Sequence, residues 1–388
     1  MTHSIEPAID PRNKPTFLLD WELTLKCNLD CSYCVNGGPF AGHDTTADHP
    51  ALEDCIKTID FMFAYADLYM QRKPSWTRMV VLNVYGGESL FHPDIVEILK
   101  EIKKRHKKYQ QQWPLTVTCT TNGVVGQRLL NSVIEYVDEF TVSYHSETLP
   151  KQKQQILDNL AAIKANDKRL KVIVLMHGNE QKWPELFSVI DFCKQNNINY
   201  LPKQLDGDVN SNYNQSQIVW FKNLWNDKTS TKAKEKQRDL ISHKDFENKQ
   251  TQLSDIGRAC CGGRLMCTNQ DLKHNIFYIP DNNFQGWRCA VNWFFLFIRQ
   301  DTGEIFSNKD CRMNFDGTVS PLGYLNRWQE LLNETEARLE KETLPAMTCA
   351  KSRCLCGLCA PKAQSEEEFI KIMDKHVRAI TPSAKILA

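Results

Sequence analysis

The sequence predicts an α/β fold in which a partial (βα)6 TIM-like barrel, residues 1–205, precedes a small cysteine-rich α+β domain, residues 255–388. Two observations predict it: apolar runs alternate with helix-like stretches in the first half, and most cysteines gather near the two ends. Parallel strands cannot be joined by a tight hairpin, so strand–helix alternation implies parallel strands with helical crossovers. Six such strands are too few for a closed eight-stranded barrel.

The expected strands are apolar or β-branched runs: Thr16–Leu25, Met79–Tyr85, Leu115–Thr120, Glu139–Tyr144, Lys171–Met176 and Ile198–Lys203. The expected helices lie between them and show helical spacing of apolar residues: Ala51–Tyr69, Pro93–Tyr109, Gln127–Val137, Lys151–Asn166 and Trp183–Asn196. Residues 206–254 are rich in Asn, Gln and Lys and are expected to form a polar helical connector. Ser365, followed by three glutamates, is expected to open a last helix.

Composition narrows the function. The 388 residues carry 48 basic and 47 acidic side chains, a net charge of +1, so no global field attracts nucleic acid or anionic lipid, and no such partner is expected. The N-terminus lacks a signal pattern, and the longest strongly apolar run, Trp293–Ile298, is far short of the roughly 20 residues that span a bilayer. A cytoplasmic protein is expected. Its fifteen cysteines, an odd number, favour metal sites over disulfides.

Three cysteines follow the first strand with CxxxCxxC spacing: Cys27, Cys31 and Cys34. Three thiolates in one loop can hold three corners of a [4Fe–4S] cluster and leave the fourth iron open, as a catalytic centre requires. The alternatives are a zinc loop or unligated core cysteines. Zinc sites usually use paired CxxC units, so the spacing favours the cluster.

This pattern resembles the CxxxCxΦC signature of the radical S-adenosylmethionine (SAM) superfamily, with Tyr33 as the aromatic. Three further loops, each at the end of an expected strand, resemble the family in the same order: the GGE motif at 86–88, the TTNG loop at 120–123 and the polar segment 143–146. Barrel folds collect their chemistry at these strand ends. The residues that the resemblance assigns to SAM are Tyr33, Gly86, Gly87, Glu88, Asn122, Ser143 and His145.

The resemblance also implies a mechanism. The open iron would chelate the amino and carboxylate groups of SAM, with the Glu88 carboxylate helping to hold the ammonium. Electron transfer from the reduced cluster would cleave SAM to methionine and a 5′-deoxyadenosyl radical, which would abstract a hydrogen atom from the substrate. A reductant such as flavodoxin or ferredoxin would supply the electron. The protein itself would supply binding, orientation and exclusion of water.

The C-terminal cysteines resemble the twitch and SPASM auxiliary-cluster domains of the superfamily. Cys289 and Cys311 bracket an expected strand–turn–strand, although seven residues separate Gly303 from Cys311 where SPASM usually has four. The first ligand set for an auxiliary [4Fe–4S] cluster is Cys289, Cys311, Cys356 and Cys359. A second cluster would draw on Cys261, Cys267, Cys349 and Cys354, so one or two auxiliary clusters are expected. A structural zinc site is the alternative.

Enzymes with such domains modify peptides and proteins or oxidise polar small molecules. The resemblance therefore favours an oxidoreductase that acts as a ribosomal-peptide maturase, with a sugar or amino acid as the alternative substrate. Only about fifteen residues precede the first strand, so leader recognition is expected elsewhere, for instance in a separate leader-binding protein. A non-enzymatic electron carrier or zinc module remains a further alternative, but the GGE and TTNG loops argue against it because neither needs a SAM site.

Overall fold

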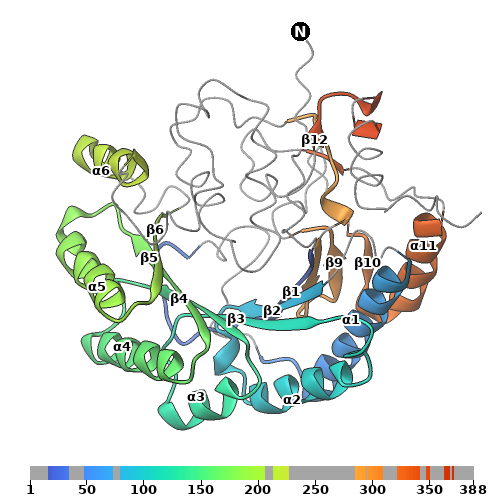
Figure 1. Ribbon diagram of the computed structural model, residues 1–388, viewed down its shortest axis with the longest axis horizontal. Coiled ribbons are helices and arrows are strands. Elements are labelled where there is room, and N and C mark those ends of the chain that lie inside the picture. Colours follow the sequence, from blue (N-terminus) through green and yellow to red (C-terminus); the bar gives the residue numbers. More distant parts are fainter. Residues whose placement is uncertain are drawn as a thin grey trace, which may run out of the picture.

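The computed structural model describes the barrel and a small second sheet. The described residues are 16–34, 48–72, 79–205, 213–226, 285–293, 295–308, 321–340, 347–349, 362–367 and 369–370. Figure 1 shows helices around the outside of a curved sheet. The expected connector beyond residue 226 and most of the expected C-terminal helix lie outside the described residues.

Six parallel strands lie within a nine-stranded sheet of order β10-β9-β8-β1-β2-β3-β4-β5-β6. The six are β1 (Thr16–Thr24), β2 (Met79–Gly86), β3 (Leu115–Thr121), β4 (Glu139–Tyr144), β5 (Arg169–Met176) and β6 (Asn199–Gln204). Each pairs in parallel with the next along the chain. This topology confirms the α/β class with a partial barrel, and no strand end differs from its expected position by more than two residues.

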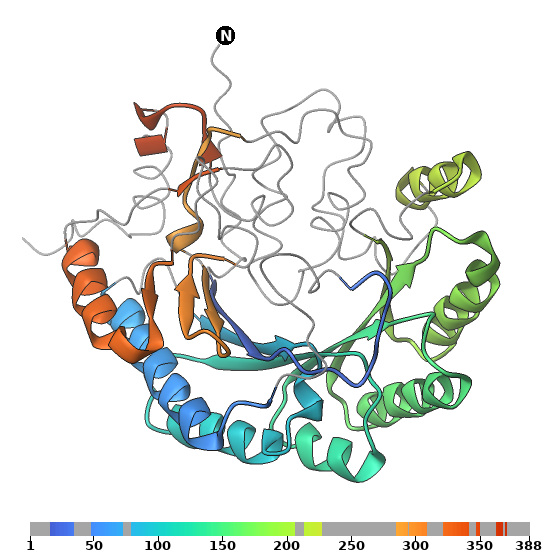
Figure 2. The same ribbon diagram turned by 180° about the vertical axis from the view of Figure 1, so that it is seen from behind.

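Helices cross over between these strands on the convex side of the sheet (Figures 1 and 2). They are α1 (Leu52–Arg72), α2 (Ile95–His106), α3 (Gln127–Ile134), α4 (Pro150–Ala165) and α5 (Trp183–Gln195). After β6, α6 (Gln215–Asn226) packs on α5, where the rings of Trp183 and Trp220 lie 5.1 Å apart. Each crossover returns the chain to the same edge, so the loops after the strands gather at one end of the barrel.

Strand β1 shows how the two faces of the sheet differ. Phe17 stacks on Tyr69 of α1 with ring centroids 4.4 Å apart, so the odd-numbered positions of this part of β1 face the helices. Asp20 therefore faces the concave side, where it accepts a 3.1 Å hydrogen bond from Asn83 of β2. Asn83 in turn accepts a 3.0 Å bond from Thr118 of β3. The convex face thus carries the apolar core, and the concave face carries a polar ladder.

Three further strands extend the sheet on the other side of β1: β8 (Phe295–Arg299), β9 (Glu304–Phe306) and β10 (Gly323–Tyr324). β8 runs parallel to β1, and the β8–β9 turn includes Gly303 at a φ of +69°, a conformation that favours glycine. The expected strand–turn–strand is present. The cysteine-rich region contributes these strands to the barrel sheet, whereas the division of the chain at residues 205 and 255 stays a prediction.

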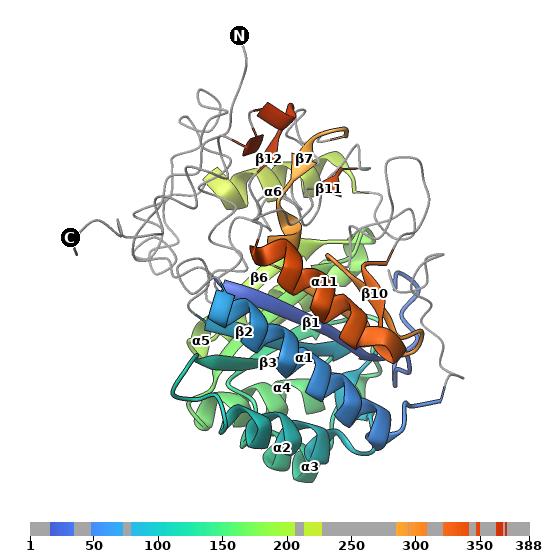
Figure 3. The ribbon, with the colours of Figure 1, turned by 90° about the vertical axis from the view of Figure 1, so that its right-hand side faces the viewer.

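The second sheet has the order β11-β7-β12 and lies beyond one end of the barrel (Figure 3). Its strands are β7 (Arg288–Cys289), β11 (Met347–Thr348) and β12 (Lys362–Ala363). A last described helix, α11 (Trp328–Glu340), lies along α1, where Arg72 pairs with Glu336. Four short 3-10 turns complete the described elements: η2 (Ser89–Phe91), η3 (Glu180–Lys182), η6 (Val291–Trp293) and η7 (Leu325–Arg327). Within the described ranges, no helix has the length and apolar character needed to cross a bilayer.

Candidate active site

The loop that carries the cysteine triad follows β1 at the carboxyl edge of the parallel strands. Cys27, Cys31 and Cys34 are each partly exposed, and none forms a disulfide. A 3.0 Å hydrogen bond from the Cys34 amide to the Cys31 carbonyl closes a turn between the last two. The loop thus presents three thiols at the barrel end where catalytic groups of this fold gather.

The electrostatics of the triad fit a metal cluster. Burial, with a smaller contribution from the neighbouring thiols, raises the pKa of the Cys27 thiol to about 11 and that of Cys31 to about 12. Three thiolates so close together need a cation, and metal binding supplies that charge as it displaces the thiol protons. In the described part of the chain, no three Cys, His, Asp or Glu side chains converge on the position of one ion. A donor set of three thiols suits a [4Fe–4S] cluster whose fourth iron stays open.

Asn122 of the TTNG loop contacts the start of the triad directly. Its side-chain amide lies 3.7 Å from the Cys27 sulfur and donates a 2.7 Å bond to the Asn28 side chain. The Asn28 amide donates in turn to the Val124 carbonyl at 2.8 Å, and the Leu29 amide lies 3.4 Å from the Cys27 sulfur. Hydrogen bonds of this kind to ligand sulfurs tune the potential of iron–sulfur clusters.

The GGE loop lies against the backbone that leads into the triad. Gly87 donates to the Thr24 carbonyl at 2.7 Å, and Glu88 donates to the Lys26 carbonyl at 2.9 Å. A Cβ at Gly86 would lie 2.1 Å from the Thr24 oxygen, and one at Gly87 would lie 2.3 Å from the Leu25 oxygen. Only glycine permits this approach, so the two glycines set the path of the chain before Cys27.

Glu88 joins the GGE loop to the TTNG loop. Its buried carboxylate accepts a 2.9 Å bond from the Leu90 amide and a 2.6 Å bond from the Asn122 amide. Burial raises the pKa of Glu88 to about 7, against the opposing effect of these hydrogen bonds. The side chain therefore joins the two loops where they meet, and its role toward SAM stays a prediction.

His145 and Tyr33 lie together beside Cys31. The His145 Nδ1 atom is 3.4 Å from the Cys31 sulfur and 3.3 Å from the Tyr33 hydroxyl, and the two rings stack at 5.9 Å. Burial lowers the pKa of His145 to about 4, so its imidazole is neutral near pH 7. Ser143, two residues earlier in β4, is half-buried. The structure thus places His145 against the triad loop, next to the aromatic residue of the signature.

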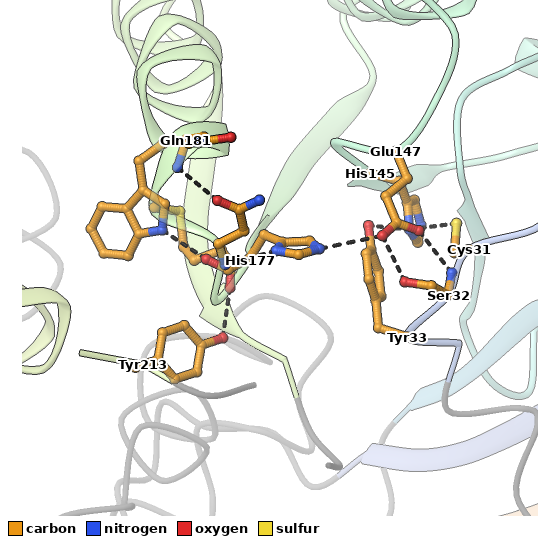
Figure 4. Close-up of polar contacts among 11 residues, drawn as sticks. Cys31, Ser32, Tyr33, His145, Glu147, His177, Gln181 and Tyr213 are labelled. Carbon is orange, nitrogen blue, oxygen red and sulfur yellow. Dashed lines mark hydrogen bonds and ion pairs between the residues drawn. The ribbon is translucent and has the colours of Figure 1, made fainter. Parts of the chain in front are cut away.

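Two further residues were missed by sequence reasoning. Both carboxylate oxygens of Glu147 bond to Ser32, and His177 approaches the same carboxylate (Figure 4). Burial would raise the pKa of Glu147, but hydrogen bonds from Ser32 and His177 hold it below its usual value. The available signal was position, because His177 directly follows the expected strand Lys171–Met176 and Glu147 follows the polar segment after the fourth strand.

Of the expected auxiliary ligands, Cys289 and Cys349 lie within the described residues. Cys289 lies in β7, opposite Met347 of β11. Cys349 comes two residues after Met347 and therefore lies on the same face of the strand pair. Both cysteines are buried. Cys261, Cys267, Cys311, Cys354, Cys356 and Cys359 lie outside the described residues. The auxiliary ligand sets therefore stay a prediction, and the structure places Cys349 near Cys289 across the β7–β11 pair.

No protein-family model matches the chain. Over 190 residues, 46% of the chain, it is 26% identical to the GTP 3′,8-cyclase of Lactiplantibacillus plantarum and 27% identical to that of Limosilactobacillus fermentum. The match covers 50% of each, so the chain spans about half the length of these curated relatives. This similarity accompanies a triad loop bonded to GGE and TTNG loops at one barrel end. The similarity to these enzymes is consistent with the resemblance of the triad, GGE and TTNG loops to the radical SAM superfamily.

Two solved structures resemble this chain at low sequence identity. Native anSMEcpe with bound AdoMet and the Cp18Cys peptide is 14% identical, with 94% of this chain and 99% of that chain covered and a TM-score of 0.48. Streptococcus suis SuiB bound to S-adenosylmethionine is 11% identical, with 84% and 68% covered and a TM-score of 0.44. At such identities no residue role carries over from them.

Proposed function

We propose that this chain binds SAM at a [4Fe–4S] cluster held by Cys27, Cys31 and Cys34 and removes a hydrogen atom from a peptide or protein substrate. The observation that carries the proposal is the convergence of three loops. The GGE loop bonds to the backbone before Cys27, and Asn122 of the TTNG loop contacts the Cys27 sulfur. When bound, the reduced cluster and SAM supply a 5′-deoxyadenosyl radical as the hydrogen-abstracting agent.

The residues of the chain have separate tasks in this proposal. The three thiols hold iron, and the Asn122 amide donates toward the Cys27 sulfur. Gly86 and Gly87 let the GGE loop pack against the backbone before Cys27, and the ionised Glu88 carboxylate attracts the SAM ammonium. The surrounding barrel wall excludes water, which protects a radical from side reactions.

The polar side chains on the concave face of the barrel favour the proposal of a polar substrate. Asp20, Asn83 and Thr118 form a hydrogen-bonded ladder there, and Thr120 adds a 3.3 Å bond to Asn83. Asn83 lies three residues before the GGE loop on β2, and Thr118 lies two residues before the TTNG loop on β3. A peptide backbone or a polar side chain offers the donors and acceptors that such a wall binds.

A polar small molecule is the second candidate, and the relatives favour it. Both are GTP 3′,8-cyclases by name, so a nucleotide is a candidate substrate alongside a sugar or an amino acid. A short precursor-peptide gene beside this one would favour the peptide substrate. Release of 5′-deoxyadenosine that GTP stimulates, and candidate peptides do not, would favour the nucleotide.

Replacing Cys27, Cys31 and Cys34 with Ala tests the central proposal. Anaerobically reconstituted protein is expected to hold about eight irons, or about twelve with two auxiliary clusters, at four per cubane. The triple variant should lose about four of these and all reductive SAM cleavage. Cys193→Ala, at a buried position in α5, is the matched control and should lose neither. SAM cleavage by the triple variant would refute the proposal.

The same iron measurement addresses the proposed auxiliary site at Cys289, Cys311, Cys356 and Cys359. Cys356→Ala combined with Cys359→Ala should lose auxiliary iron and product formation yet keep SAM cleavage, because the triad is complete without them. Circular dichroism on the same sample separates this result from loss of fold, since metal binding and folding are coupled in cysteine-rich regions.

A further inference from the structure

Ser32, inside the triad loop, is held by one carboxylate from a distant part of the chain. Its backbone amide donates to Glu147 Oε2 at 2.7 Å, and its hydroxyl donates to Glu147 Oε1 at 2.6 Å. The two residues are 115 positions apart. Both are charge-assisted hydrogen bonds, and together they fix the position and the orientation of the backbone between Cys31 and Tyr33.

Glu147 is itself oriented by His177. The Asn179 amide donates to His177 Nδ1 at 2.9 Å, which leaves the ring proton on Nε2. Nε2 lies 3.3 Å from Glu147 Oε1 and donates to it. The His177 side chain is only 5% exposed, and its carbonyl accepts a 2.7 Å bond from the Trp183 indole. The ring is therefore fixed before it meets the carboxylate.

The adjacent Tyr33 is held from both sides (Figure 4). Its ring stacks on His145 at 5.9 Å with planes 5° apart, and it meets His177 edge-on at 5.6 Å and 78°. Residues that follow β4 and β5 thus contact two consecutive residues of the loop, Ser32 through hydrogen bonds and Tyr33 through ring contacts. Nothing in the cysteine spacing itself requires these contacts.

We propose that Glu147 is a positioning residue that, oriented by His177, holds the triad loop at Ser32 and so presets Cys31 and Cys34 for the cluster. This inference rests on the proposed function, because it assumes that the triad holds iron. Three thiols on a short loop must lose conformational freedom to bind one cluster, and a loop already fixed loses less. Outer-shell groups of this kind are worth about 10- to 100-fold in metal affinity.

Glu147→Gln tests the role, with Glu185→Gln as the matched control. Gln keeps the shape but turns an amide NH2 toward a donor of Ser32. Glu185 is a partly buried carboxylate nearby that accepts from Tyr144 and Lys153 instead of the triad loop. In metal-free protein, amide hydrogen exchange in segment 27–34 should be faster in Glu147→Gln alone. In reconstituted protein, iron release to a chelator should be about 10- to 100-fold faster.

The conservative variant and the wild type separate the outcomes. His177→Gln retains an N–H donor toward Glu147 and should release iron more slowly than His177→Phe. Exchange and iron release in Glu147→Gln equal to those in Glu185→Gln would overturn the positioning role. If the Cys31→Ala variant holds as much iron as the wild type, the proposed cluster at the triad is refuted. That result is distinguishable from failure of the positioning role.

Discussion

Glu88 combines burial with an ionisable carboxylate, and this combination affects stability. In the metal-free protein its pKa is raised from 4.5 to about 7, chiefly by burial. Between these values the folded state holds a proton that the unfolded state has released. The contribution of Glu88 to the free energy of unfolding is therefore fully present below pH 4.5. It falls by about 3 kcal/mol as the pH rises to 7.

Glu88→Gln should remove this pH dependence. We expect the difference in the free energy of unfolding between wild type and variant, measured by urea at pH 5 to 8, to fall as pH rises and to level off above 7. Glu135→Gln, at an exposed position, is the control and should give a difference that does not change with pH. A constant difference for Glu88→Gln as well would show that burial does not shift this carboxyl as described.

At the scale of elements, the GGE loop and the triad loop are built as one unit. The backbone of Gly87 lies so close to Leu25 and Lys26 that an added Cβ would meet their carbonyl oxygens at 2.3 and 2.6 Å. Backbone atoms cannot turn aside as a flexible side chain can. Any larger residue at 87 must therefore move the end of β1 and, with it, Cys27.

Gly87→Ala should lower the free energy of unfolding by about 1–3 kcal/mol, the usual cost of overpacking, and reduce iron retention at the triad. Gly126→Ala is the matched control, because a Cβ there meets nothing within 4 Å. Urea unfolding and iron analysis of both variants provide the measurement. Equal stability and equal iron in the two variants would contradict the close approach at Gly87.

At the scale of the whole molecule, Gln300 links the neighbouring strands β8 and β1 to the first helix. Its side-chain oxygen accepts a 2.9 Å bond from the Trp21 indole, 279 positions away, and a 2.8 Å bond from the Thr58 hydroxyl. Thr58 also reaches the Asp54 carbonyl at 3.0 Å. Gln300 follows β8, so this contact accompanies the pairing of β8 with β1.

Gln300→Leu should destabilise the fold by about 1–3 kcal/mol, because it leaves the buried Trp21 N–H without an acceptor while Thr58 keeps the Asp54 carbonyl. The midpoint of urea unfolding measures the effect. Gln154→Leu removes an exposed amide on α4 and should change stability by less than about 0.5 kcal/mol. Equal midpoints for the two variants would show that the β1–β8 seam does not depend on this contact.

Local pattern predicted most of the barrel and the site loops. All six parallel strands and five crossover helices appear where apolar spacing indicated, and the triad, GGE and TTNG loops follow the expected strand ends. Strand–helix alternation alone brings those loops to one edge. That is why Asn122 and Cys27, 95 positions apart, could be expected in one site before any contact was seen.

By itself, the sequence determined the secondary structure of the barrel and the edge at which its loops meet. The spacing of apolar residues is a local property, and the alternation of strands and helices that it reveals implies parallel strands. Only the tertiary structure decided that β8 pairs with β1, that Glu147 and His177 hold Ser32, and that Glu88 braces two loops. These contacts depend on orientation between segments far apart in the chain. A carboxylate or an imidazole at a strand end can face a ligand, a neighbouring loop or water, and packing selects among them.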